Sequence, residues 1–230
     1  IPALASANPD HFGICVAATS GQLFEAGETD VPFSIQSLSK PFLFALICEA
    51  IGEREAREKL GVNSTGLPFN SVLAVERTEE GLSNPMVNAG AIAATSLAPG
   101  DSLEERWAFI QEGFSRFAGR PLQVDEAVYA SELATNRRNV GIANLLEEQE
   151  RIWLDPEAAT DLYTRQCALS VTTRDLARMA ATLANGGCQP KGGRQVIEPL
   201  ICQHVLAVMV TAGLYETSGD WLYDIGLPGK

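Results

Sequence analysis

The chain has 230 residues, of which 46% are hydrophobic and 20% are charged, as in folded globular proteins and unlike disordered ones. Its 29 acidic and 17 basic residues give a net charge of −12, which disfavours nucleic acids and anionic membranes as partners. No apolar run approaches membrane-spanning length. Five widely spaced cysteines without a Cys-x-x-Cys pair indicate reduced thiols in a cytoplasmic protein, not a disulfide framework or a metal site.

The N-terminal part is predicted to form a β-hairpin and then a helix. Short β-prone runs between residues 13 and 33 alternate with glycine-containing turns. After residue 40 the apolar residues recur on one helical face, and Gly52 ends the pattern. Because Pro41 is compatible only with the first turn, the helix is expected to begin close to Ser37.

The start of this helix carries Ser37 and Lys40 in the stretch QSLSK. Residues three apart share a helical face, and a helix N-terminus offers free N–H groups to a developing oxyanion. Lys40 could act as the base for Ser37 if burial lowers its pKa, and its apolar neighbours favour burial. Taken alone, the stretch fits a capping serine and a lysine with its stem on apolar surface at least as well.

The stretch NPMVNAGAIAATS at residues 84–96 combines a turn with a run of small residues after Asn88. Small residues allow close backbone packing, and an amide can both donate and accept hydrogen bonds, which suits a polar substrate. Asn88 also fits a structural role, as the cap of a tightly packed helix.

Four helices are predicted in the middle and C-terminal parts. The helix at 102–119 begins with a capping-box pattern of Ser102 and Glu105. A helix at 126–148 is expected to break near Gly141. Further helices are predicted at 172–187, with a threonine cap, and at 198–213. The last segment, DWLYDIGLPGK, has aromatic residues typical of a strand before a turn.

Several polar residues on these elements are candidates for a binding site. Glu132, Asn136 and Asn139 are spaced to share one face of a helix and could grip an ammonium and a carboxylate, although a solvated polar face has the same pattern. Tyr163 and Tyr215 could bind a substrate or relay a proton, or could equally be packing aromatics.

Other catalytic schemes find little support. The sequence has no Gly-x-Ser-x-Gly elbow and no phosphate-binding glycine loop. The two histidines, His11 and His204, lie in contexts that point to no triad, and no His, Cys and carboxylate residues cluster at metal-ligand spacing. We therefore expect no metal and no organic cofactor.

Strands at both ends with helices between them predict an α+β fold, with an antiparallel sheet flanked by helices and an inserted all-helical lobe. The sheet-containing lobe is expected to comprise residues 1–36 and 196–230. The mainly helical lobe is expected at 37–195, with the Ser37 helix at the junction.

Seven stretches in order along the whole chain resemble the serine-dependent glutaminases, a family with the β-lactamase/penicillin-binding-protein fold. The matching stretches are IPALA, QSLSKPF, NPMVNAGAIA, SELATNRRN, YTRQCALSVT, MAATLANGG and GLYETSG…GLPGK. The ordered set is far more specific than any single motif, and it favours the functional interpretation of each.

The resemblance implies a role for each matching residue. Ser37 would attack the side-chain amide of L-glutamine to form an acyl-serine, Lys40 would take its proton, and the Ser37 N–H would be part of the oxyanion hole. Tyr215 would relay a proton to the departing ammonia. The substrate's amino and carboxylate groups would be held by Asn88, Glu132, Asn139 and Tyr163, with Glu132 nearest the ammonium. Ser37 and Tyr215 would also contact the substrate.

The sequence departs from the family pattern at its ends. The family places a substrate-binding tyrosine just before IPALA, and continues its final lysine as Lys-Ser-Gly into a strand that supplies the second oxyanion N–H. Because this chain begins at Ile1 without Met and stops at Lys230, we expect a longer parent chain, whose N-terminal leader could be missing.

Two other functions compete with the glutaminase interpretation. One is a β-lactamase-like or peptidase-like acylating enzyme on the same fold. The other is a catalytically inactive homologue that binds an amino acid. The resemblance also implies a homo-oligomer, a dimer or a tetramer.

Overall fold

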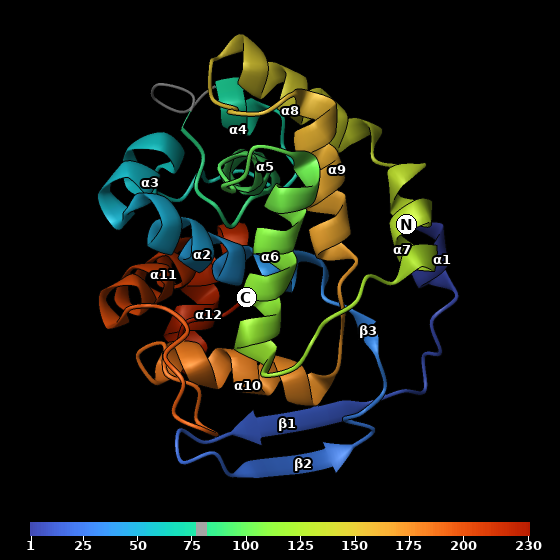
Figure 1. The fold of residues 1–230 in the computed structure, drawn as a ribbon, viewed down its shortest axis with the longest axis vertical. Helices are drawn as coiled ribbons and strands as arrows, with labels where there is room; N and C mark the ends of the chain where they lie inside the picture. Colours follow the sequence, from blue (N-terminus) through green and yellow to red (C-terminus); the bar gives the residue numbers. More distant parts are fainter. Residues whose placement is uncertain (77–81) are drawn as a thin grey trace.

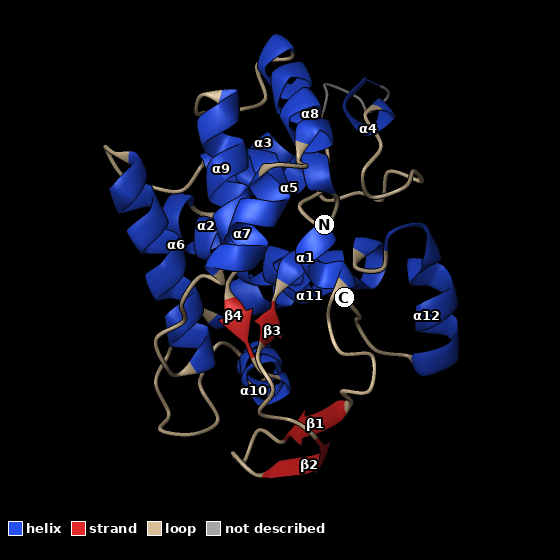
Figure 2. Ribbon diagram, turned by 90° about the vertical axis from the view of Figure 1, so that its right-hand side faces the viewer, coloured by secondary structure: helices blue, strands red, loops and turns tan. Residues whose placement is uncertain are grey.

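The computed structural model describes residues 1–76 and 82–230. In chain order its elements are α1 (Pro2–Ala5), β1 (Gly13–Ala17), β2 (Leu23–Gly27), β3 (Phe33–Ser34), a 3₁₀ helix (Gln36–Ser39), α2 (Lys40–Ile51), α3 (Glu53–Leu60), α4 (Leu73–Glu76), α5 (Asn88–Ser96), α6 (Leu103–Ala118), α7 (Glu126–Leu133), α8 (Arg137–Glu148), α9 (Pro156–Cys167), β4 (Ser170–Val171), α10 (Thr173–Ala184), α11 (Pro199–Ala212), a 3₁₀ helix (Tyr215–Thr217) and α12 (Ser218–Ile225). The α+β class is confirmed: helices dominate, and two small antiparallel sheets lie toward one end (Figure 2).

The predicted N-terminal hairpin is confirmed. β1 pairs antiparallel with β2, with Gly13 opposite Gly27 and Ala17 opposite Leu23. α10 packs against β1 and lies between the hairpin and the other helices (Figure 1). The predicted cap of α10 is also confirmed, because Thr172 and Asp175 form a complete capping box.

A second, two-stranded sheet fixes the start of the Ser37 helix. β3 pairs antiparallel with β4, and the Ile35 N–H donates to the Leu169 carbonyl at 2.8 Å. The chain therefore enters the 3₁₀ helix at Gln36–Ser39 from a segment tied to the end of α9.

α2 is the central helix of the core. Its residues from Lys40 to Cys48 are all buried, as expected for a helix that is apolar nearly all round. Phe42 makes edge contacts with the rings of Phe114 and Phe117 of α6 at 6.3 and 5.1 Å. Gly113 of α6 lies so close to Leu46 that a side chain at this position would overlap it. This packing holds the first residue of α2, Lys40, inside the protein.

The small residues of α5 serve the close packing that their sequence predicts. A Cβ at Gly90 would overlap the backbone carbonyl oxygens of Ser83 and Asn84, so only glycine fits. α5 is buried along its whole length and packs against α8 and α9. Asn88 is its first residue and does not cap it, since no side-chain cap is present.

The prediction of a break at Gly141 is wrong. α7 ends at Leu133 and α8 begins at Arg137, while Gly141 lies in the interior of α8 with open space around its Cα. A glycine in a helix interior lowers the stability of the helix by about 1 kcal/mol relative to alanine. The packing of α8 against α5 and α9 can offset this loss. At the true break, the Thr135 hydroxyl bonds the carbonyls of the preceding turn.

The prediction of a strand in the last segment is also wrong. Ser218–Ile225 forms α12, which ends at Gly226 in the left-handed conformation. The Trp221 indole N–H then donates to the Leu227 carbonyl at 2.9 Å, which ties the turn to the helix. The aromatic residues indicated a strand, but the local capping interactions favour the helix.

Among the described residues no single helix is long and apolar enough to cross a membrane. Pro199–Ala212 and Tyr215–Ile225 together have sufficient length and apolar composition, but they are bent by 91° relative to each other. The division into lobes at 1–36 with 196–230 and at 37–195 remains a prediction. α10, which it assigns to the helical lobe, packs on the hairpin.

Candidate active site

Ser37 lies in the 3₁₀ helix that leads directly into α2, as its motif predicts. The residue before it, Gln36, has a positive φ of 49°, a conformation that is rare for a residue with a side chain. Unusual backbone of this kind persists only where surrounding contacts hold it, and it is common at functional sites. Ser37 is half-buried, so its hydroxyl can be reached from outside.

Lys40 is a buried cation, with 1% of its surface exposed. Its ammonium donates to Asn88 Oδ1 at 2.7 Å, and no described carboxylate forms an ion pair with it. Burial lowers the pKa of Lys40 to about 8, because desolvation disfavours the charged form. A lysine with this pKa is partly neutral near neutral pH and can accept a proton.

Tyr215 comes from the other end of the chain and reaches Ser37. Its phenol lies close enough to Ser37 to interact with it: burial raises the pKa of Tyr215, and the interaction with the Ser37 side chain opposes the rise. Its φ of 58° is the second rare backbone conformation next to Ser37. The ring packs on Phe69 at 5.0 Å between centroids, which limits its orientation.

Lys230 is the second lysine whose side chain lies over the Tyr215 ring. The Lys230 ammonium lies 3.8 Å from the ring centroid and the Lys40 ammonium 5.7 Å from it. Lys230 also donates to the Met86 carbonyl at 3.3 Å. Burial, with a smaller contribution from Lys40, lowers the pKa of Lys230 to about 6.

A cavity of about 240 Å³ contains the polar residues that the sequence singles out. Asn88, Glu132, Asn136 and Asn139 line it, together with Ile1, Phe69, Asn70, Thr135 and Arg138. Glu132 and Asn139 belong to two different helices, so the single helical face predicted for them is wrong. The break at residues 134–136 instead turns α8 so that both side chains reach one cavity.

Asn88 links the catalytic lysine candidate to the cavity. Its Oδ1 accepts from the Lys40 ammonium and, at 3.4 Å, from the Tyr163 hydroxyl. Its Nδ2 donates to Asn139 Oδ1 at 3.0 Å. Tyr163 is fully buried at this position, and desolvation raises its pKa well above the ordinary value.

Glu132 is a carboxylate in an environment that favours a cationic ligand. It is 7% exposed, and burial raises its pKa because the charged form loses water. Within the described residues its side chain accepts one hydrogen bond, at 3.4 Å from the neutral amide of Gln36, and this bond partly opposes the rise. No described Lys or Arg side chain forms an ion pair with Glu132, and a bound ammonium would supply that partner.

Gln36 is the contact residue that the sequence analysis missed. Its amide donates to Ser34 Oγ at 3.2 Å, to Glu132 Oε2 and, at 3.3 Å, to the Cys167 carbonyl. It therefore connects the nucleophile candidate with the carboxylate of the cavity. The signal available in the sequence was its position directly before Ser37.

The described residues contain no group of three or more His, Cys, Asp or Glu side chains that could hold a metal ion. The polar groups at the site are hydroxyl, amine, amide and carboxylate groups. A serine beside a lysine of lowered pKa, a phenol and a cavity that contains a carboxylate suit the transfer of an acyl group to the serine from a small substrate that carries an ammonium group.

Comparison with known proteins agrees with this chemistry. The family model for glutaminase matches residues 1–230. Glutaminase 2 of Yersinia pestis is 60% identical over 229 residues, covering 100% of this chain and 67% of that protein. A Brucella canis glutaminase is 48% identical over 230 residues, covering 100% of this chain and 73% of that protein.

Among solved structures, one described as the probable glutaminase ybaS superimposes with a TM-score of 0.97 at 39% identity. The alignment covers 100% of this chain and 74% of that one. The fold, the site and these relatives lead to one conclusion: the chain belongs to the glutaminase family, the amidohydrolases that convert glutamine to glutamate and ammonia.

Proposed function

We propose that the chain hydrolyses the side-chain amide of L-glutamine through an acyl-serine intermediate on Ser37. The observation that carries this mechanism is the meeting of Ser37, Lys40 and Tyr215, from opposite ends of the chain, beside a cavity that contains Glu132. A nucleophile, a base of matched pKa and a proton donor are the three groups that amide hydrolysis requires.

In the first step Lys40 accepts the Ser37 proton and the Ser37 oxygen attacks the amide carbon of glutamine. The resulting oxyanion is stabilised by the backbone N–H of Ser37 at the start of the helix. The C–N bond then breaks, and the nitrogen leaves as ammonia after it receives a proton through Tyr215. Water finally attacks the acyl-serine ester, which releases glutamate and restores the Ser37 hydroxyl.

The lysine beside Tyr215 fits its role as a proton relay. A phenol that passes on its proton becomes briefly negative, and Lys40, which is protonated after the first step, lies close enough to the Tyr215 ring to stabilise that charge. The interaction between the Ser37 and Tyr215 side chains supports this role, because the proton donor has to lie close to the nucleophile.

The cavity supports the choice of a free amino acid as substrate. Glu132 would bind the α-ammonium, while the amides of Asn88 and Asn139 and the hydroxyl of Tyr163 would hold the α-carboxylate and the remaining polar atoms. A volume of about 240 Å³ leaves room for a small amino acid. Such a site should reject analogues without the α-groups, since its buried polar atoms would lose their partners.

The test is ammonia release by the full chain with glutamine, with asparagine and with a chromogenic β-lactam. Glutamine turnover should fall about 10³-fold or more in Ser37→Ala, because loss of a nucleophile leaves only the binding contribution. Ser20→Ala, in the exposed hairpin turn, is the matched control and should be unchanged. β-Lactam cleavage without glutamine turnover would favour the β-lactamase-like alternative. Glutamine binding without turnover would favour an inactive homologue.

Three further properties are proposed on the family resemblance, the net charge and the cysteine content. We infer a cytoplasmic homo-oligomer, a dimer or a tetramer, that uses neither nucleic acid nor a membrane as partner. Light scattering coupled to gel filtration tests the assembly, and a monomer at micromolar concentration would contradict it.

A further inference from the structure

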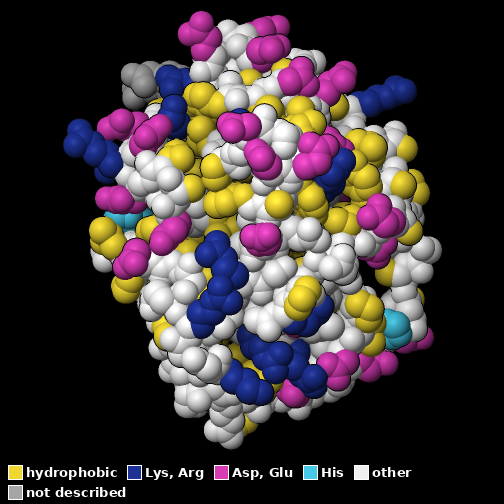
Figure 3. Space-filling model, in the orientation of Figure 1, with side chains coloured by type: hydrophobic (Ala, Val, Ile, Leu, Met, Phe, Trp, Pro, Cys, Tyr) yellow, Lys and Arg dark blue, Asp and Glu magenta, His cyan; other side chains and the backbone are white. Residues whose placement is uncertain are grey.

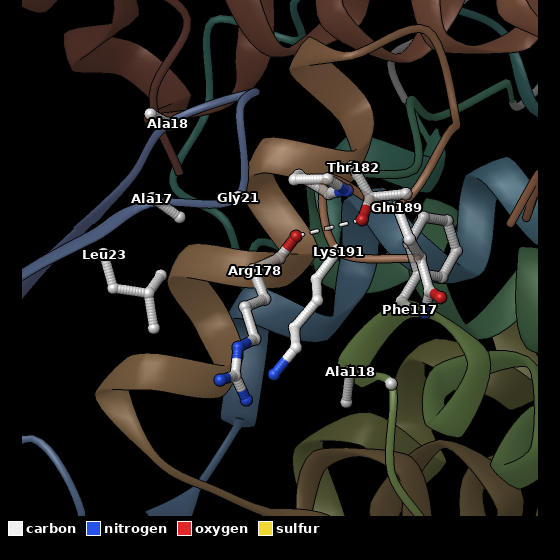
Figure 4. Close-up of a pocket in the computed structure, with 12 residues that line it drawn as sticks. Ala17, Ala18, Gly21, Leu23, Phe117, Ala118, Arg178, Thr182, Gln189 and Lys191 are labelled. Carbon is white, nitrogen blue, oxygen red and sulfur yellow. Dashed lines mark hydrogen bonds between the residues drawn. The ribbon is translucent and has the colours of Figure 1, made fainter. Parts of the chain in front are cut away.

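A second cavity, of about 330 Å³, lies between the hairpin and α10, and we call it the hairpin cavity. None of its lining residues lines the cavity that holds Glu132. Its walls are largely apolar: Leu23 comes from β2, and Phe117 and Ala118 come from the end of α6 (Figure 4). The cavity is therefore concave, apolar and open at one side, as small-molecule sites commonly are.

Two cationic side chains border the hairpin cavity. Arg178 extends from α10 and Lys191 from the loop that follows it, and in Figure 4 both run in the same direction and end on the same side of the cavity. Within residues 1–76 and 82–230, neither side chain has an ion pair or a side-chain hydrogen bond to a carboxylate. Arg178 is half-buried, so part of its hydration is already lost.

The neighbouring arginine on α10, unlike Arg178, has acidic partners. Arg174, one turn earlier, contacts Glu25 and Asp30, each at 2.6 Å. Arg178 is close enough to contribute to the lowered pKa of Glu25, but it makes no ion pair with that carboxylate. Glu25 and Asp30 therefore form ion pairs with Arg174, whereas Arg178 lines the cavity.

The positive character continues beyond the hairpin cavity. An adjoining pocket shares Gly119 and Gln189 with it and is lined by Arg116, by Arg194 and by Arg120, whose charge is paired with Asp175. Neither lining contains an aspartate or a glutamate. Basic side chains gather over α10 and the nearby end of α6, whereas acidic ones dominate the opposite part of this face (Figure 3). This is unexpected for a chain with a net charge of −12.

We propose that the hairpin cavity binds a small organic phosphate, with the phosphate between Arg178 and Lys191 and the apolar body against Leu23 and Phe117. An arginine fork matches phosphate oxygens, and a lysine adds a mobile point charge. A phosphate monoester carries about −1.5 to −2 charges at neutral pH, which two cations can balance, whereas a carboxylate carries one.

The test is calorimetric titration of the full chain with phenyl phosphate at constant ionic strength. We expect phenyl phosphate to bind at one saturable site. Inorganic phosphate should bind this site at least about tenfold more weakly, because it lacks the apolar body. Benzoate should also bind it at least about tenfold more weakly, because it lacks the second negative charge. Arg178→Gln and Lys191→Gln should each weaken binding about tenfold or more. Arg54→Gln, which also removes one exposed cation but lies on α3, is the matched control and should bind normally.

Several results would overturn the proposal. One is that phenyl phosphate shows no saturable binding, and another is that Lys191→Gln binds it as tightly as the unmodified chain. A third is that Arg54→Gln loses as much affinity as the cavity variants, which would mean a general effect of charge. Inorganic phosphate or benzoate binding as tightly as phenyl phosphate would also reject an organic phosphate as the ligand. Lys191 is exposed on its loop, so its substitution should leave folding intact, and glutamine hydrolysis by each variant verifies this independently.

Discussion

The candidate active site and the hairpin cavity each present two basic side chains without a described carboxylate partner, but they differ in access to water. Lys40 is buried and Lys230 is half-buried, and desolvation lowers their pKa values to about 8 and about 6. Arg178 is half-buried and Lys191 is exposed, so both remain in contact with solvent. The comparison teaches that burial, and not charge alone, turns a cation into a base.

The largest expected effect comes from removing the buried base. Lys40→Met should lower kcat for glutamine about 10³-fold or more, because Ser37 then lacks a proton acceptor. Steady-state ammonia release measures this loss. The matched control is Lys59→Met, which removes a lysine that packs on Trp153 on the outside of α3 and should keep full activity.

The same variant also tests the cost of burial. Methionine fills a similar volume without a charge to desolvate, so the urea midpoint of Lys40→Met should not fall below that of the unmodified chain. An inactive variant that is also strongly destabilised would mean that Lys40 is mainly structural.

The next effect concerns the carboxylate of the substrate cavity. Glu132→Gln should raise KM for glutamine about 10- to 100-fold, since a neutral amide cannot pair with the α-ammonium. Initial rates over a range of glutamine concentrations measure it, with Glu126→Gln, exposed on the same helix, as the control. If KM stayed the same and only kcat fell, Glu132 would act on the chemical step instead.

The pH profile distinguishes Lys40 from Lys230. Because the neutral amine of Lys40 is the proposed base and its pKa is about 8, kcat/KM should rise about tenfold per pH unit below 8 and level off above it. Rates of ammonia release between pH 6 and 9 give the profile. A rise in kcat/KM with its midpoint near pH 6 would identify Lys230 as the base instead of Lys40. A kcat/KM that does not change with pH would exclude both lysines as the base.

The smallest effect compares the paired and unpaired arginines of α10. Arg174→Gln should lower the free energy of unfolding only slightly, because its ion pairs with Glu25 and Asp30 are partly exposed and screened by solvent. Arg178→Gln, without such a pair, should change it by less than about 0.3 kcal/mol. Urea unfolding measures both. Equal losses would show that Arg178 has a structural partner and would weaken the case for a ligand.

Elements with strong local signals were predictable from the sequence. The hairpin, the capping boxes of α6 and α10, and the start of α2 near Ser37 depend on residues within a few positions of each other, and all are present. Predictions that depended on a single residue type failed. Gly141 did not break α8, and the aromatics of the last segment did not form a strand, because packing and capping outweighed those weak preferences.

By itself, the sequence determined that Ser37 lies just before the helix that begins at Lys40 and, through its ordered motifs, the family. Only the tertiary structure decided the environment of those residues. Burial of Lys40, the approach of Tyr215 and the meeting of Glu132 with Asn139 across a helix break all depend on contacts between distant segments. The loss of water around a charged group and the meeting of distant residues both depend on three-dimensional packing, so a local sequence pattern cannot predict them.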